Sequence, residues 1–175
     1  MKIFINAGHG GNDPGAVSKN GTKERDITKN VSSLLVCKLI QNGYNVEYFQ
    51  QETSFTEVSK AENTSNSDLF ISIHCNAATS QSANGVEVLY YPTSSKGKNC
   101  AQIVQKELVK TTKLKDRGIK SRNDLHVLKR TKTVAILVEL AFLTNPTEEK
   151  LLIENPETFA NAIFEGIKNI KSKNI

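Results

Sequence analysis

The chain is poor in residues that stabilise or anchor a protein by means other than a packed core. Its three cysteines (Cys37, Cys75 and Cys100) are an odd number without a close pair. This argues against a disulfide framework and against a structural zinc site of the cysteine type. No apolar run approaches the ~18–20 residues that span a bilayer. We therefore expect no membrane span.

The N-terminus also lacks the features of a secretory signal. Residues 1–6 (MKIFIN) enter a strand-like pattern directly, with no charged segment followed by an apolar one. A signal peptide has both. The sequence leads us to expect either a protein made in the cytoplasm or a domain trimmed from a longer protein.

Tryptophan is absent and aromatic residues make up 6% of the chain, but charge is plentiful and unevenly placed. Residues 106–132 contain ten Lys or Arg against three Asp or Glu. Such a stretch indicates either a polyanionic partner or an ordinary solvated helix face and loop. A nucleic-acid partner would rest on this charge alone, because no recognised nucleic-acid motif is present. We expect no nucleic-acid partner.

Length and composition indicate one globular domain. The 175 residues fit a single domain of ordinary size. A hydrophobic share of 38% with 23% charged residues excludes wholesale disorder. No linker, repeat or low-complexity segment divides the chain. We expect residues 1–175 to form one domain and the protein to be a monomer.

Apolar runs typical of strands alternate with segments of helical periodicity. Residues 133–139 (TVAILVE) are nearly all apolar, as in a central strand covered on both faces. Ile27, Val31 and Leu35 recur at helical spacing. The alternation predicts an α/β domain with a mostly parallel, twisted sheet of about six strands, helices on both faces and room for an antiparallel edge pair. The expected strands are residues 2–6, 45–49, 69–74, 85–91, 125–129 and 133–139, and the expected helices are 24–42, 55–66, 95–112, a short helix capped by Thr147, and 156–170.

Four polar residues lie where a site is expected in such a sheet, outside the carboxyl ends of the strands. His9 follows the first strand, His74 ends the third, Glu139 ends the last, and Glu24 begins the first helix. Two imidazoles and one carboxylate are a ligand set of catalytic zinc sites, in which a fourth position stays open. A second carboxylate can serve as the general base. The placement therefore favours a zinc site with an adjacent base.

Taken singly, each of these residues has a structural alternative. His9 can be a hydrogen-bonding loop residue, His74 a satisfied core histidine and Glu24 an ordinary acid in a first helical turn. Glu139 is harder to explain this way, because a carboxylate after an apolar run is rarely buried without a partner. The third histidine, His126, lies in the expected strand 125–129 among basic residues, and we favour a groove-lining or structural role for it.

Three motifs resemble the catalytic domain of the zinc-dependent N-acetylmuramoyl-L-alanine amidases of the type-3 family. They are INAGHGGNDPGA (residues 5–16), LFISIHCNA (69–77) and VAILVELAFLTNP (134–146). The segments GVEVLYY (85–91), DRG (116–118) and LHVLK (125–129) are also similar. The likeness runs over nearly the whole chain in the expected order, and the three motifs together are highly specific.

The resemblance implies a role for each candidate. His9, Glu24 and His74 match the family's ligands of one zinc ion per chain, and Glu139 matches its catalytic glutamate. Asn76 is expected to support the ligands or to line the substrate groove, as is His126. The implied activity is hydrolysis of the amide between N-acetylmuramic acid and the L-alanine of the peptidoglycan stem peptide.

Other functions remain open from the sequence. One is another zinc hydrolase that cuts within the stem peptide, and a second is a non-catalytic wall-binding module, against which an intact Glu139 argues. We expect the protein to degrade the bacterial cell wall, with peptidoglycan as its partner and anionic wall polymers as candidate partners of the basic stretch. Without a signal peptide in this chain, it resembles a phage-type lysin or a trimmed domain of a secreted enzyme.

Overall fold

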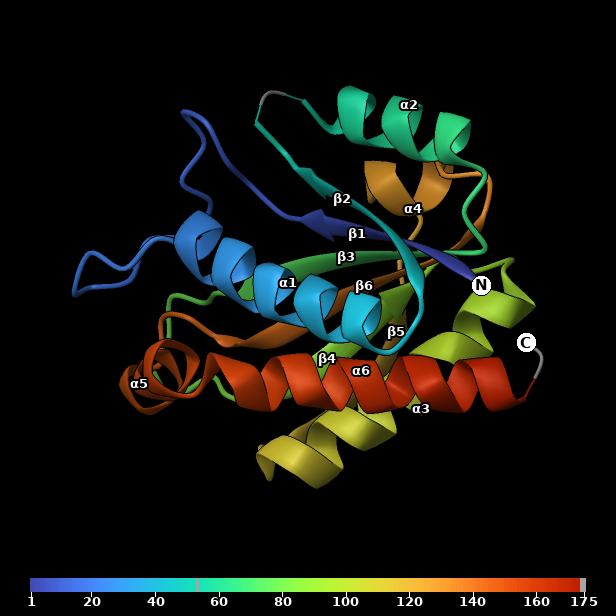
Figure 1. Cartoon of the computed structure of the whole chain (residues 1–175). Coiled ribbons are helices and arrows are strands. Elements are labelled where there is room, and N and C mark those ends of the chain that lie inside the picture. Colours follow the sequence, from blue (N-terminus) through green and yellow to red (C-terminus); the bar gives the residue numbers. More distant parts are fainter. Residues whose placement is uncertain (53, 174–175) are drawn as a thin grey trace.

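The computed structural model describes residues 1–52 and 54–173, which form one six-stranded sheet with helices on both faces (Figure 1). The sheet has the order β2-β1-β3-β6-β4-β5. The strands are β1 (Lys2–Ala7), β2 (Asn45–Gln50), β3 (Leu69–Asn76), β4 (Val86–Tyr90), β5 (Asp116–Ser121) and β6 (Val134–Phe142). The helices are α1 (Glu24–Gln41), α2 (Phe55–Ser65), α3 (Ser95–Thr112), α4 (His126–Arg130), α5 (Pro146–Glu154) and α6 (Pro156–Ser172).

Four strands run parallel and two run the other way. β2, β1, β3 and β6 are parallel neighbours, whereas β4 pairs antiparallel with β6 and parallel with β5. The predicted α/β class, the mostly parallel sheet of six strands and the antiparallel edge pair are therefore confirmed. Because β1, β3 and β6 are parallel neighbours, their carboxyl ends lie together at one rim of the sheet.

Two hydrophobic clusters fill the space between sheet and helices. The larger cluster lies between the sheet and helices α1, α3 and α6, and the smaller one packs α2 and α4 against the other face. In Figure 1, α1 and α6 cross in front of the sheet, and α2 and α4 lie side by side above it. Alternate residues of β3 belong to different clusters: Ile71 and Ile73 face the larger cluster and Phe70 the smaller.

Two parts of the predicted fold were wrong. Residues 125–129 do not form a strand, because His126–Arg130 is helix α4, in which the consecutive residues Val127 and Leu128 are both buried. A strand alternates its faces and cannot bury two neighbours on one side. The sixth strand is instead β5 (DRGIKS), a partly exposed edge strand without the apolar run that marks the others.

A helix start was also misplaced. The N-cap of α5 is Asn145 rather than Thr147: the Asn145 side chain accepts hydrogen bonds from the backbone N–H groups of Thr147 (3.0 Å) and Glu148 (3.1 Å). Pro146 takes the first helical position, where its missing N–H is not needed.

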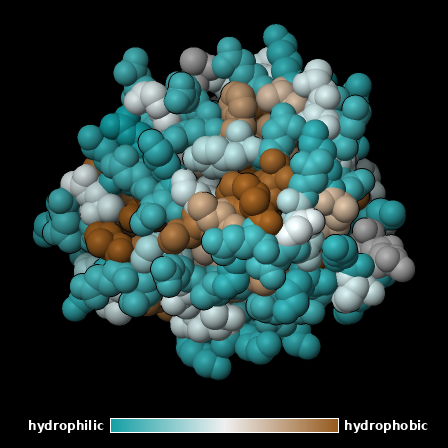
Figure 2. Space-filling view, viewed as in Figure 1, coloured by the Kyte–Doolittle hydropathy of each residue, from teal (hydrophilic) through white to brown (hydrophobic). Residues whose placement is uncertain are grey.

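The surface and the thiols are unexceptional. Figure 2 shows a mostly hydrophilic face with hydrophobic residues gathered in patches near its middle. All three cysteines are free thiols, with Cys37 exposed and Cys75 and Cys100 buried. Among the described residues, no helix combines the length and apolarity needed to cross a bilayer.

The central strand β6 should carry much of the fold's stability. Ile136 is fully buried in β6, and Ile136→Ala should lower the free energy of unfolding by ~2–5 kcal/mol through lost burial and a cavity. Ile40→Ala is the matched control: this side chain is 58% exposed at the end of α1, so the change should be within ~0.5 kcal/mol. Urea unfolding measures both. Equal losses in the two variants would contradict the assignment of the core.

Candidate metal centre and active site

His9 lies in the loop after β1, in a backbone conformation that few non-glycine residues adopt. Its φ of 61° is left-handed, which turns the ring back toward the sheet rim. Asp13 Oδ2 lies 2.8 Å from His9 Nδ1, and Nε2 lies 3.3 Å from Glu24 Oε2. Asp13 therefore fixes the ring by one nitrogen and leaves the other nitrogen facing Glu24, as an outer partner of a metal-ligating histidine does.

His74 ends the inner strand β3 and faces the same carboxylate. Its Nδ1 lies 3.0 Å from Glu24 Oε1. Its neighbour Cys75 is buried in the larger hydrophobic cluster, on the opposite face of the strand, so this thiol points away from the site. The His74 ring lies against Gly8, where an added Cβ would be 2.2 Å from His74 Cε1. Only glycine fits at position 8 while His74 keeps this position.

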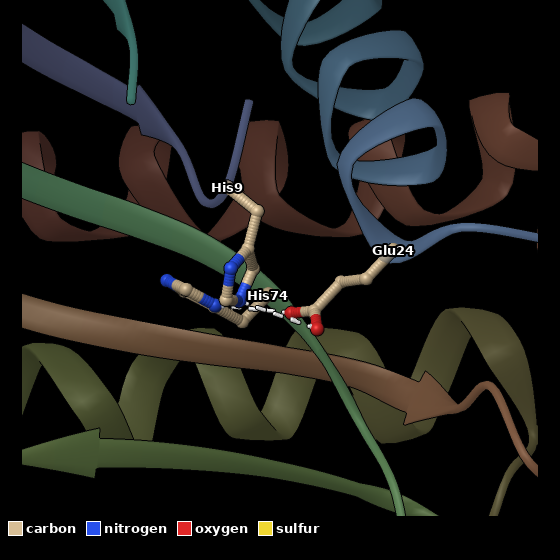
Figure 3. Close-up of side chains that lie close together, drawn as sticks. All are labelled: His9, Glu24 and His74. Carbon is tan, nitrogen blue, oxygen red and sulfur yellow. Dashed lines mark hydrogen bonds and ion pairs between the residues drawn. The ribbon is translucent and has the colours of Figure 1, made fainter. Parts of the chain in front are cut away.

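Glu24 is the first residue of α1, and its buried carboxylate faces the rings of His9 and His74 (Figure 3). Besides the rings, it accepts backbone hydrogen bonds from Ala16 (2.9 Å) and Cys75 (3.0 Å). Burial alone would raise the pKa of Glu24, but the hydrogen bonds and charges of His74 and His9 outweigh it and hold the pKa far below its usual range. The helix N-terminus favours the same charged form.

The three side chains meet as a ligand set would. His9, Glu24 and His74 each offer one atom, and these atoms lie within 4.8 Å of one another. Within residues 1–52 and 54–173, no other group of His, Cys, Asp or Glu does so. The donor set of two imidazoles and a carboxylate suits Zn²⁺, and the lowered pKa of Glu24 keeps its carboxylate in the ionised form that binds a metal.

Glu139 lies beside this group on β6, opposite His74 in the pairing of β3 and β6. Its Oε2 is buried and, among the described residues, has no hydrogen-bond partner. Burial, together with the charges of Glu24 and Glu87, raises the pKa of Glu139 to about 8 against the opposing effects of His9 and Arg122. A carboxyl group with a pKa near neutrality and a free oxygen can both accept and donate a proton at this rim.

Glu87 of β4, the strand neighbour of Glu139, was not predicted to take part. Asn76 Nδ2 donates to Glu87 Oε1 and Arg117 Nε donates to Glu87 Oε2, both at 2.8 Å. Asn76 therefore supports the carboxylate next to Glu139, and its side-chain amide does not contact a ligand histidine directly. Arg117 also covers the Phe142 ring at 4.7 Å, which fixes the position of the guanidinium.

His126 begins α4 instead of lying in a strand, and it lines a pocket beside His74. The pocket has a volume of about 300 Å³ and is lined by His74, Asp124, Leu125, His126, Val127 and Leu137. The groove-lining or structural role expected for His126 stays a prediction. Half of the lining residues are aliphatic, and the others carry two imidazoles and a carboxylate.

The structure thus brings together His9, Glu24, His74 and Glu139, with Asn76 and His126 at the edges of the site. Sequence reasoning missed Asp13, Glu87 and Arg117. A signal existed for Asp13, four residues after His9 in a Gly-rich turn. Glu87 and Arg117 lie in the family-like segments GVEVLYY and DRG, but their contact with each other forms only after distant strands pair. Arg25, next to Glu24, is half-buried and donates from Nη1 to the Gly11 carbonyl at 2.6 Å.

Comparisons with known proteins show which family the chain is similar to. The sequence profile of the N-acetylmuramoyl-L-alanine amidase family Amidase_3 matches residues 3–169. An uncharacterised Bacillus subtilis protein, YqiI, is 35% identical over 94% of this chain and 82% of its own length. The N-acetylmuramoyl-L-alanine amidase CwlM of Bacillus licheniformis is 33% identical over 97% of this chain. The chain spans 66% of CwlM and 34% of another such amidase, LytC of Bacillus subtilis.

A solved structure is also similar. The crystal structure of an N-acetylmuramoyl-L-alanine amidase from Clostridium difficile 630 superposes with a TM-score of 0.92 at 31% identity, covering 99% of this chain and 98% of that one.

The contacts of His9 lead to a testable titration. Burial alone would lower the pKa of His9, but Glu24 and Asp13 outweigh it and raise the value from 6.5 to about 9. In chelator-treated protein, the ring should therefore titrate near pH 9 by NMR. A raised folded-state pKa stabilises the fold fully below pH 6.5, and this contribution is lost as pH rises from 6.5 through 9. Asp13→Asn should lower the pKa, and a wild-type ring that titrates near 6.5 would refute the contacts.

Proposed function

The chain belongs to the N-acetylmuramoyl-L-alanine amidase family, and we propose that residues 1–175 act as one catalytic domain that cleaves peptidoglycan. The bond cleaved is the amide between the lactyl group of N-acetylmuramic acid and the L-alanine of the stem peptide. The observation that carries this proposal is the convergence of His9, Glu24 and His74 beside a carboxylate, Glu139, whose buried oxygen has no partner among the described residues.

We further propose that one Zn²⁺ per chain binds to His9 Nε2, the Glu24 carboxylate and His74 Nδ1. The donor set fits zinc, and Asp13 already occupies the other nitrogen of His9. A bound zinc ion would act as a Lewis acid towards the scissile carbonyl and make water a stronger acid. The backbone N–H groups of Ala16 and Cys75 hold Glu24 in place for this role.

Glu139 performs the proton transfers in this proposal. Its free oxygen takes a proton from the attacking water and then delivers it to the departing nitrogen of L-alanine. A pKa of about 8 suits both steps, because neither protonation state is strongly disfavoured near neutral pH. Arg117 and Asn76 bind Glu87, so this neighbouring carboxylate is engaged and Glu139 remains the carboxylate with an open oxygen.

The pocket beside His74 would hold the part of the substrate next to the scissile amide. Its aliphatic lining suits a small apolar group such as a methyl, and water is displaced from the reacting bond when the pocket fills. We propose that the enzyme acts at the bacterial cell wall as a monomer, and that exposed basic residues between 106 and 132 face anionic wall polymers.

The products separate this function from its alternatives. An amidase releases intact stem peptides with new L-alanine amino termini and leaves the glycan free of peptide. A zinc hydrolase that cut within the stem would yield other termini, and a wall-binding module would bind walls without releasing any. End-group analysis of digested, purified peptidoglycan distinguishes the three.

A pair of isosteric variants separates base from ligand. Glu139→Gln keeps the size of the side chain but removes the proton acceptor, so turnover should fall by ~10²–10⁴-fold while zinc stays near one per chain. Glu24→Gln weakens a ligand and should lower zinc occupancy first. Metal analysis and kinetics on soluble muropeptides measure both. If Glu139→Gln lost its zinc and regained full activity when zinc was added, the two roles would be reversed.

A further inference from the structure

The sheet face that carries His74 and Glu139 continues beyond the site onto β4 and the edge strand β5. Among the described residues, α3 is the one helix with extensive contacts to β4 and β5. Its buried residues belong to the larger hydrophobic cluster, together with Val86 and Val88, and thus to the opposite face. On the α2–α4 side, Leu89 of β4 is buried in the smaller cluster with residues of α4, whereas Lys120 of β5 is exposed.

Strand register shows which side chains lie on the α2–α4 side of β4 and β5. Leu137 of β6 pairs with Leu89 of β4, and Leu89 pairs with Lys120 of β5. Leu137 and Leu89 both belong to the smaller cluster, on the α2–α4 side of the sheet. Lys120 stands in the same row, two strand spacings or about 10 Å from the pocket residue Leu137. Its side chain is 47% exposed, with the ammonium 3.8 Å from Glu87 Oε2.

A second cation, Arg122, is held at the edge of the pocket. Its Nε and Nη2 donate to the two oxygens of Asp124 at 2.8 and 2.7 Å. Asp124 lines the same pocket as His74, so this fork fixes the guanidinium beside the place where substrate would bind. Nη1 and one hydrogen of Nη2 remain for another acceptor.

The directions of the pKa shifts agree with a position of Arg122 near the candidate active site. The hydrogen bonds of Asp124 raise the pKa of Arg122 against a smaller effect of burial, and the charges of Asp124, Glu139 and Glu87 add to the increase. Arg122 in turn acts to lower the pKa of Glu139. The guanidinium therefore lies within electrostatic range of the proposed base, although it does not contact it.

The proposed substrate places a negative charge at a matching distance. Beyond the scissile nitrogen come L-alanine and a second residue that is joined through its side-chain carboxyl, so that its α-carboxylate is free. Two residues of extended chain span at most about 7 Å. A stem peptide that leaves the pocket past Asp124 towards β5 would bring this carboxylate within reach of the long side chains of Arg122 and Lys120.

We propose that Arg122, positioned by Asp124 and assisted by Lys120, binds the free α-carboxylate of the second stem residue and so sets the substrate preference of the enzyme. The inference rests on the proposed amidase function and adds a recognition site to it. Guanidinium groups bind carboxylates by charge-assisted hydrogen bonds that an uncharged amide cannot match. Amidation of this one carboxylate should thus weaken binding.

The test uses two N-acetylmuramoyl dipeptides, one with the second α-carboxyl free and one with it as the carboxamide. For the zinc-loaded wild-type enzyme, kcat/KM should be ~10-fold higher for the carboxylate, mainly through KM. In Arg122→Gln this ratio should fall close to one, with the amide substrate affected far less. Lys120→Gln should lower the ratio by a smaller factor.

Arg130→Gln is the matched control, because Arg130 is an exposed arginine at the far end of α4 from His126. It should retain the wild-type ratio, and thermal unfolding should show all variants folded. Wild-type enzyme that cleaves both dipeptides equally well would overturn the inference and leave the amidase function standing. Failure to cleave either dipeptide or purified peptidoglycan would refute the function, and the inference with it.

An assay on whole cell walls tests the alternative that Arg122 binds an anionic wall polymer. If Arg122→Gln lowered activity on walls but left the ratio between the dipeptides unchanged, Arg122 would bind an anionic wall polymer. That result would also overturn the carboxylate site.

Discussion

The buried carboxylate of Glu24 is the contact on which the rest of the site depends. It joins the N-terminus of α1 to the loop after β1 through Ala16 and His9, and to the end of β3 through His74 and the Cys75 backbone. A carboxylate without partners would be strongly disfavoured in this position. With two imidazoles and two backbone N–H groups around it, the charge becomes the centre that aligns three separate segments. The left-handed backbone at His9 and the glycine at position 8 are local conditions for the same arrangement.

The two acidic residues on the neighbouring strands illustrate how the surroundings divide roles between identical groups. Glu87 and Glu139 are directly paired between β4 and β6. Glu87 is bound by Asn76 and Arg117, whereas an oxygen of Glu139 has no partner among the described residues. Burial raises the pKa of Glu139 most, and the negative charges of Glu24 and Glu87 raise it as well. The sheet itself, by its register, thus selects which carboxylate is available for proton transfer.

The sequence was informative where burial imposes a pattern. The apolar runs of β3 and β6 predicted inner strands, and the polar residues at their ends, together with the family motifs, predicted His9, Glu24, His74 and Glu139. Prediction failed for elements at the edge of the fold and for contacts between residues that are far apart in the sequence. β5 is a polar edge strand whose identity comes from pairing with β4, and α4 is a single turn and a half that local propensity does not distinguish from a strand. Asp13, Glu87 and Arg117 act through contacts whose partners the sequence does not reveal.

The position of β6 in the sheet has a consequence for synthesis of the chain. All three candidate ligands are translated by residue 74, but β6, which carries Glu139, begins at residue 134 and lies between β3 and β4. Until it emerges from the ribosome, both of these strands present an unpaired inner edge, the kind of surface that recruits other strands and aggregates. The growing chain therefore holds a complete ligand set long before it holds a complete sheet. Part of its last quarter, strand β6, inserts into the middle of the sheet, so a shortened chain would lose Glu139, the candidate general base, together with the strand that joins the two halves of the sheet.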